Sequence, residues 1–180
     1  YIFIDEYQDT NILQEEIISK IKRENNLFMV GDVKQSIYRF RLARPELFME
    51  KYQHFSVEES SRQRIDLHRN FRSRREVVDA VNDIFYPLMG QDIGNVGYDA
   101  EAALYAGAVF PEYEKPECCK PELLLVPMDG SSAERREQEA FAVAGRIRQM
   151  IDAQQIPGLE LKDIVILLRS MSGWAEVYQN

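Results

Sequence analysis

Apolar positions along the chain alternate between short continuous runs and helical spacing, the pattern of a protein built from strands and helices. Runs rich in β-branched and aromatic residues at 1–4 and 27–30 are typical of buried parallel strands. Between them, apolar residues recur every three or four positions and predict a helix over about 11–25. Such a strand-helix-strand succession is a parallel crossover unit, so we expect both strands to end at one edge of a sheet.

The same alternation continues to the end of the chain. It predicts helices near 45–54, over Val77–Phe85 and over about 134–152, and strands at 64–67, 122–126 and 164–168. A polar run at 58–61 indicates a hinge. Between about 89 and 121 the pattern lapses into Gly, Pro, Tyr and acidic residues, which indicates an irregular excursion. Alternating strands and helices predict an α/β fold with a parallel sheet.

Two adjacent carboxylates, Asp5 and Glu6, directly follow the first predicted strand. Ligands of open α/β sheets bind outside the carboxyl ends of the strands, which is where this pair lies. We expect Asp5 to hold a hydrated Mg²⁺ on the phosphates of a nucleotide, and Glu6 to deprotonate the attacking water. The alternative is that these acids and Asp9 are only turn and helix-cap residues, because acids are favoured at a helix start.

The second predicted strand runs into the segment Gly31–Arg41, which combines a neutral amide with aromatic and basic side chains. An amide such as Gln35 can bond a phosphate oxygen while it is present and lose that bond when it leaves, which suits a nucleotide sensor. Tyr38 and Phe40 offer flat faces on which unpaired bases can stack. Four basic residues supply charge for phosphates: Lys34, Arg39, Arg41 and Arg44.

Arginines also crowd around the predicted strand at 64–67. The planar guanidinium matches phosphate oxygens and keeps its charge at any ordinary pH. For Arg62, Arg74 and Arg75 we favour simple surface charge, because charged side chains are mostly exposed. For Arg72 we favour a phosphate contact.

Three segments resemble, in order, the second, third and fourth helicase motifs of the UvrD/Rep-like superfamily-one DNA helicases: Asp5–Thr10, Gly31–Arg41 and Leu67–Ser73. Within that family, the third motif and the helix after it are most similar to the AddA helicase-nuclease subunits of bacterial AddAB recombination enzymes. The resemblance implies a parallel-sheet, RecA-like P-loop NTPase core. Residues 1–61 would be the C-terminal part of its first lobe, and residues 62–180 the N-terminal part of its second. No G-x-x-x-x-G-K-[ST] phosphate loop occurs, so we expect an internal fragment of a longer protein.

The resemblance also implies a role for individual residues. Asp5 corresponds to the Mg²⁺ carboxylate, Glu6 to the catalytic base and Gln35 to the γ-phosphate sensor. Arg72 matches an arginine that reaches the γ-phosphate from the opposite lobe, and Phe71 an aromatic that stacks on adenine. The positions that correspond to contacts with single-stranded DNA are Tyr38, Phe40 (often tryptophan in the family), Arg41 and Arg169.

The function implied by this resemblance is an ATP- and Mg²⁺-dependent DNA helicase or translocase. It would act on single-stranded DNA from duplex ends, as the helicase-nuclease component of a double-strand-break repair complex with an AddB-like partner. We expect residues 1–180 alone to be inactive. The alternative is a non-catalytic helicase-like module that binds DNA or a partner; the complete set Asp5, Glu6, Gln35 and Arg72 counts against it. A metal-dependent nuclease is disfavoured, because two-metal cleavage needs several separated acids.

Composition changes this picture little. The formal charge of -8 would ordinarily argue against a nucleic-acid partner, but residues 34–44 carry four basic side chains and no acid, and such a patch acts at short range. No apolar run approaches the length of a membrane span. The adjacent Cys118 and Cys119 fit neither a disulfide framework nor a zinc site. We therefore expect a cytoplasmic protein without a membrane partner.

Overall fold

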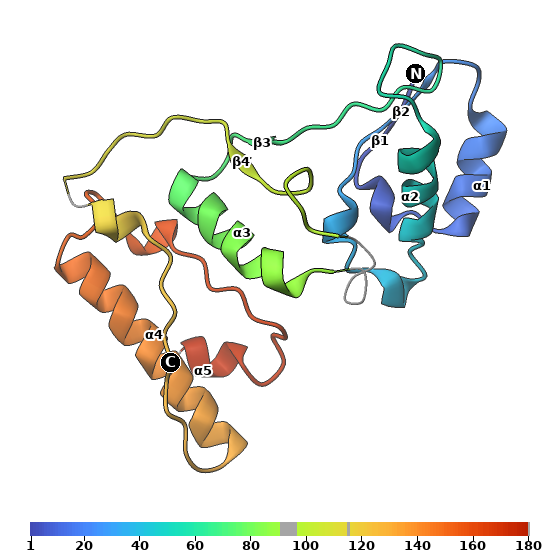
Figure 1. The fold of residues 1–180 in the computed structure, drawn as a ribbon. Coiled ribbons are helices and arrows are strands. Elements are labelled where there is room, and N and C mark those ends of the chain that lie inside the picture. Colours follow the sequence, from blue (N-terminus) through green and yellow to red (C-terminus); the bar gives the residue numbers. More distant parts are fainter. Residues whose placement is uncertain (91–96, 115, 180) are drawn as a thin grey trace. The chain divides into compact units, whose positions relative to one another are not determined.

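The computed structural model describes residues 1–90, 97–114 and 116–179, and it is a mixed α/β structure with short parallel strand pairs (Figure 1). The chain divides into two compact units. The first unit consists of Tyr1–Phe71 and Val81–Gly107, and the second unit of Arg72–Ala80 and Ala108–Asn180. The lobe boundary expected between residues 61 and 62 stays a prediction. None of the helices in the described ranges has the length and apolar character that crossing a bilayer requires.

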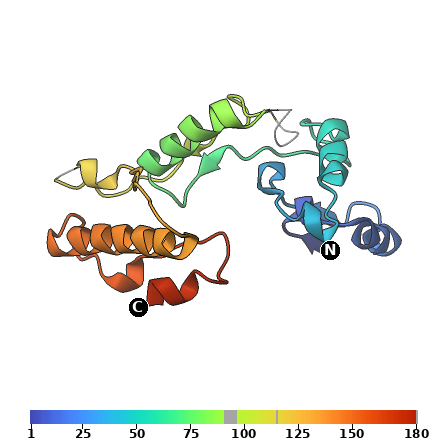
Figure 2. The same ribbon diagram turned by 90° about the horizontal axis from the view of Figure 1, so that it is seen from below.

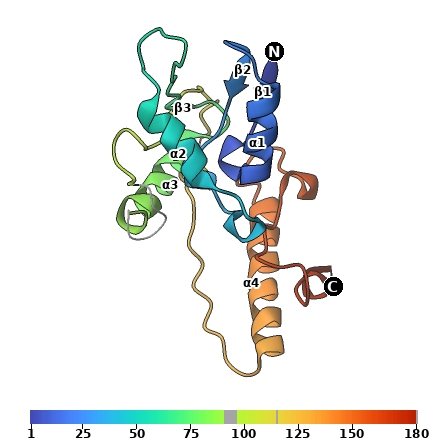
Figure 3. The ribbon, with the colours of Figure 1, turned by 90° about the vertical axis from the view of Figure 1, so that its right-hand side faces the viewer.

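The first unit opens with the predicted strand-helix-strand succession. Strands β1 (Ile2–Ile4) and β2 (Leu27–Met29) pair in parallel, with Ile2 opposite Leu27 and Ile4 opposite Met29. Helix α1 (Ile12–Ile21) connects them and lies beside them (Figure 3). It ends earlier than predicted, because the backbone of Lys22 is extended and Asn25 adopts a positive φ of 58°. The parallel pairing expected from the sequence is confirmed.

Short helical turns and one longer helix follow the two strands. The turns are η1 (Tyr7–Asp9), η2 (Val33–Gln35) and η3 (Arg39–Arg41). Helix α2 (Pro45–His54) has the predicted bounds, and it begins with a proline, whose missing N–H costs nothing in the first turn. This helix packs against η1 and η2. The rings of Phe48 and Tyr7 lie 6.2 Å apart, so α2 supports the loop that follows β1.

Helix α3 (Arg75–Leu88) and the strands β3 (Arg69–Asn70) and β4 (Tyr105–Ala106) come next, and the two strands pair in parallel. Asn82 on α3 donates from Nδ2 to the carbonyl oxygen of Leu104 at 2.8 Å and accepts from the Leu104 N–H at 3.0 Å. These two bonds order the chain just before β4, inside the irregular excursion expected at about 89–121. Residues 91–96 and 115 of that excursion lie outside the described residues.

Three predicted strands, at 64–67, 122–126 and 164–168, are wrong. A strand needs a neighbour to complete its backbone hydrogen bonds, and within the described residues these segments belong to neither of the two strand pairs. Their apolar side chains, such as Leu67, Leu125 and Leu167, are exposed. The apolar runs therefore indicate segments suited to a sheet, but the strand pairing that defines a sheet is not formed around them.

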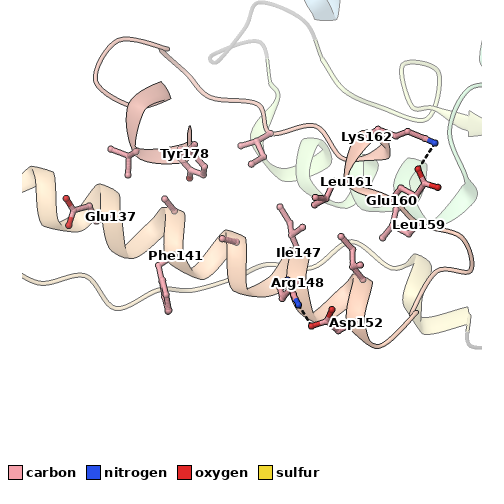
Figure 4. A pocket seen from close by; sticks show the side chains of 15 residues that line it. Glu137, Phe141, Ile147, Arg148, Asp152, Leu159, Glu160, Leu161, Lys162 and Tyr178 are labelled. Carbon is pink, nitrogen blue, oxygen red and sulfur yellow. Dashed lines mark hydrogen bonds and ion pairs between the residues drawn. The ribbon is translucent and has the colours of Figure 1, made fainter. Parts of the chain in front are cut away.

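The second unit is dominated by helix α4 (Ser132–Asp152), with the short elements η4 (Pro116–Cys119), η5 (Leu161–Asp163) and α5 (Ala175–Gln179). The predicted helix at about 134–152 is thereby confirmed. Helices α4 and α5 lie side by side (Figures 1 and 2). An open hollow of about 910 Å³ between α4, η5 and α5 is lined mostly by apolar side chains, among them Phe141, Ile147 and Leu161 (Figure 4). It contains none of the predicted site residues.

Candidate functional site

The end of β1 carries the two acids that the sequence singles out. Asp5 and Glu6 follow the strand directly, and both are exposed. Glu6 adopts a left-handed backbone conformation with φ 51°, and its N–H donates to Oδ1 of Asp5 at 2.9 Å. A non-glycine residue in this region is strained by about 1–3 kcal/mol, and such strain is concentrated at functional sites. The turn therefore holds both carboxylates at the strand end with a fixed backbone.

The end of β2 lies at the same edge of the strand pair. The N–H of Val30 donates to Ile4 at 2.8 Å, and the N–H of Tyr7 donates to Val30 at 2.9 Å. These bonds continue the ladder beyond the last residue of each strand. The segment after β1 and the segment after β2 are thus in direct contact, as expected for the carboxyl ends of parallel strands.

Asp32 organises the segment that contains Gln35. Its carboxylate accepts from the backbone N–H of Lys34 and from Nε2 of Gln35, each at 3.0 Å, and pairs with Nζ of Lys34 at 2.9 Å. Burial alone raises the pKa of Asp32, but these bonds outweigh it and lower the pKa. Asp32 therefore stays ionised and fixes the amide of Gln35. The sequence analysis gave this residue no role.

Gln8 joins the two segments through its side chain. Its Nε2 donates to Oε2 of Glu6 at 2.7 Å, and its Oε1 accepts from the backbone N–H of Asp32 at 3.0 Å. The residue is only 1% exposed. The sequence analysis assigned Gln8 to a motif but gave it no role of its own. The feature that could have indicated its role is an amide side chain two positions after the candidate base Glu6.

A buried network of side chains from α1 and α2 supports the turn η1. Tyr7 is fully buried, and its hydroxyl donates to the carboxylate of Glu15 on α1. Lys51 on α2 donates to the same carboxylate at 2.8 Å and lies 5.0 Å from the centre of the Tyr7 ring. Burial and the bond to Glu15 raise the pKa of Tyr7, so the hydroxyl stays protonated. The network ties η1 to both helices of the first unit that flank it.

The acids do not cap helix α1, although Glu6 is the N-cap residue of the turn η1 and Asp9 lies in that turn, so their alternative role as turn residues stays open. The N-cap of α1 is Asn11, whose side chain accepts from the N–H of Gln14, while Oε1 of Gln14 accepts from the N–H of Asn11, both at 2.9 Å. Oδ1 of Asp9 is buried without a hydrogen-bond partner among the described residues. Burial and the charge of Glu6 raise the pKa of Asp9. The acids after β1 are therefore not needed to start the helix.

The donor set suits a magnesium ion that a nucleotide brings with it. Among the described residues, no three His, Cys, Asp or Glu side chains converge on one point. Mg²⁺ does not need such a cage, because it binds through one or two carboxylates and completes its shell with phosphates and water. Asp5, exposed at the strand end, can supply that carboxylate.

Tyr38, Phe40 and Arg41 form a cluster after β2, called here the aromatic cluster. The two rings lie 5.9 Å apart, and the guanidinium of Arg41 lies 5.1 Å from the ring of Tyr38 and 5.5 Å from that of Phe40. The Phe40 side chain is 76% exposed and that of Tyr38 38%. Such exposed aromatic faces beside a cation are suited to stacking with bases.

The other basic residues of this stretch are engaged in ion pairs. Lys34 pairs with Asp32, while Arg39 and Arg44 both pair with Glu46. The expectation that these four cations serve phosphates stays a prediction. Arg41 is the cation that the structure places against the aromatic rings.

The remaining predicted site residues lie elsewhere in the chain. Phe71 is exposed and packs beside Gly107, where an added Cβ would lie 2.8 Å from the Phe71 ring. Arg72 and Arg169 are exposed residues of the second unit. Their roles toward nucleotide and DNA stay predictions.

Known proteins resemble this chain along nearly its whole length. Residues 1–56 match the UvrD/REP helicase N-terminal domain. The chain is 46% identical, over 99% of its length, to a protein of Alkaliphilus oremlandii that is named as an ATP-dependent helicase/nuclease subunit, of which it covers 16%. Proteins of the same name from Lachnoclostridium phytofermentans and Bacillus licheniformis are 41% and 46% identical over 98% and 97% of the chain, which covers 16% and 15% of them. The chain thus spans about 16% of the length of the curated relatives it matches.

Proposed function

On the match of residues 1–56 to the UvrD/REP helicase N-terminal domain, we propose that the protein is an ATP-hydrolysing DNA helicase. Like the relatives that are named as ATP-dependent helicase/nuclease subunits, it would work within a larger enzyme, with an AddB-like partner. Its strands would belong to a RecA-like core, and DNA-stimulated hydrolysis of Mg²⁺-bound ATP would drive movement along a single strand.

The observation that carries this proposal is the junction of the two strand ends. A continuous chain of hydrogen bonds runs from the end of β1 to η2 through Glu6, Gln8, Asp32 and Gln35. In this arrangement Glu6 accepts the proton of the attacking water as general base. Gln35, fixed by Asp32, donates its amide to the γ-phosphate. Asp5 would hold the Mg²⁺, which neutralises developing charge on the phosphate oxygens.

Further residues would complete the site and the DNA contact. We assign the aromatic cluster to single-stranded DNA, with bases stacked on Phe40 and Tyr38 and Arg41 near the backbone. On the resemblance to the family, Arg72 would reach the γ-phosphate, Phe71 would stack on adenine, and Arg169 would touch DNA. The second candidate function, a non-catalytic DNA- or partner-binding module, gives the hydrogen-bonded chain at the strand ends no chemical task.

The test is to change Glu6→Gln in the complete protein, which carries this segment. DNA-stimulated ATP hydrolysis should fall on the order of 10²- to 10⁴-fold, the usual contribution of a general base, while ATP binding persists. Glu16→Gln, the same change on the exposed face of α1, should leave the rate unchanged. Unimpaired turnover by Glu6→Gln would refute the assignment. A wild-type protein that binds DNA but never hydrolyses ATP would support the non-catalytic module.

A further inference from the structure

We propose that Gln8 is a positioning residue that orients the catalytic carboxylate of Glu6 against the backbone at the end of β2. This inference rests on the proposed ATPase function and adds a residue to it. The question it answers is how Glu6, an exposed glutamate with a long side chain, keeps one orientation toward the attacking water. A misplacement of about 1 Å in such a group can cost on the order of 10²-fold in rate.

The two hydrogen bonds of Gln8 give its amide a single orientation. A carboxylate can only accept, so Nε2 must face Oε2 of Glu6, at 2.7 Å. A backbone N–H can only donate, so Oε1 must face the N–H of Asp32, at 3.0 Å. Flipping the amide would break both bonds at once. The position of the Glu6 carboxylate is therefore set by the backbone of Asp32.

The surroundings of Gln8 leave it no room to move. The side chain is almost fully buried, and a Cβ added to Gly31 would lie 2.6 Å from Oε1 of Gln8, 3.1 Å from the N of Tyr7 and 3.2 Å from the ring of Phe48. A glycine at position 31 thus allows the close approach of the two loops. The backbone of Glu6 is held as well, in its left-handed conformation.

Asp32 links this arrangement to the phosphate sensor. Its backbone N–H holds Gln8, and its carboxylate holds Nε2 of Gln35 at 3.0 Å. The residue also caps η2 by accepting from the N–H of Lys34. A displacement of Asp32 would change the orientation of Glu6 and of Gln35 together. The base and the sensor are therefore positioned by one residue.

The decisive variant is Gln8→Glu in the complete protein. The new side chain has the same size and can still accept from the N–H of Asp32, but it presents a carboxylate oxygen to Glu6 in place of a donor. We expect kcat for DNA-stimulated ATP hydrolysis to fall on the order of 10²-fold with little change in the KM for ATP. The matched control is Gln53→Glu, the same change at an exposed position of α2, which should keep the wild-type kcat.

The split between kcat and KM separates positioning from a merely structural role. Gln8→Met, which removes both hydrogen bonds without adding charge, should also lower kcat and leave the KM for ATP close to the wild-type value.

Each outcome decides the matter. Wild-type kcat in both Gln8 variants, beside an inactive Glu6→Gln, would overturn the positioning role and leave the proposed function intact. Equal losses of kcat and of ATP affinity, with lower melting temperatures for both variants, would assign Gln8 to folding and also overturn it. Active Glu6→Gln would refute the proposed function itself.

Discussion

Truncating Phe40 to alanine should weaken binding of single-stranded DNA while leaving the fold intact. Phe40 is 76% exposed, so removal of its ring uncovers little buried surface and opens no cavity in the core. Stacking of one base on an aromatic side chain is worth about 1–3 kcal/mol, which corresponds to roughly a 5- to 150-fold rise in Kd. For Tyr38→Ala we expect the lower part of that range, because the Tyr38 side chain is only 38% exposed and offers less face.

The assay is fluorescence anisotropy of a labelled single-stranded oligonucleotide, titrated with the complete protein at several salt concentrations. Phe40→Ala should shift every Kd by a similar factor and leave the slope of log K against log salt unchanged, since no charge is lost. Arg41→Gln should reduce the magnitude of that slope by about 0.7, the value for one lost phosphate contact on a single strand. Phe40→Trp, which keeps a larger stacking face, should bind at least as well as the wild type.

The two variants test separate parts of the reasoning. Unchanged affinity in Phe40→Ala would mean that the exposed ring packs against protein and not against bases. An unchanged salt slope in Arg41→Gln would mean that the guanidinium, 5.1 Å from the Tyr38 ring and 5.5 Å from the Phe40 ring, serves the rings alone. Both results together would remove the aromatic cluster from the DNA interface.

Two further predictions concern the support of the strand ends. Gly31→Ala forces Gln8 aside, so it should lower DNA-stimulated ATPase activity and reduce the unfolding free energy by about 1–3 kcal/mol; Gly145→Ala, in an open position of α4, should do neither. Lys51→Met leaves the carboxylate of Glu15 without its cation and should reduce the unfolding free energy at pH 7, measured with urea, by about 1–3 kcal/mol. Burial raises the pKa of Glu15, but the hydrogen bonds from Lys51 and Tyr7 outweigh burial and lower this pKa below its usual 4.5. The stabilisation is thus present above pH 4.5 and is lost as pH falls through the folded pKa, so the two proteins should converge in acid. A difference that persists at low pH would contradict the ion-pair explanation.

The sequence predicts well those elements whose cause is local. Helix α2 begins and ends where expected, because Pro45 and the apolar spacing that follows act within a few residues. Helix α4 likewise has its own capping box, in which Ser131 and Glu134 bond each other's backbone N–H. The segments at 122–126 and 164–168 failed as strands for the opposite reason. A strand exists only through a neighbour, and local composition does not specify which neighbour is present.

Side-chain contacts between distant residues limited the prediction of the site in the same way. The positions of Asp5, Glu6 and Gln35 follow from where apolar runs stop, which is a local property. The ion pairs of the basic stretch at 34–44 were not predicted, because Glu46, which pairs with Arg39 and Arg44, lies just beyond it. The bond between Gln8 and Asp32 joins residues 24 positions apart, and the pair Lys51 and Glu15 spans 36. Neither contact can be predicted from the sequence before the folded arrangement of these elements is known.

The geometry nevertheless explains why glutamine stands at position 8. The buried side chain must donate to a carboxylate on one side and accept from a backbone N–H on the other. Glutamate cannot donate while ionised, and lysine cannot accept, whereas an amide satisfies both partners without burying a charge. Asparagine is one methylene shorter, so its amide cannot span the same two partners from the same backbone position. The requirement arises from two groups of opposite polarity that meet only when β1 and β2 pair in register, and the choice of Gln8 is a consequence of that pairing.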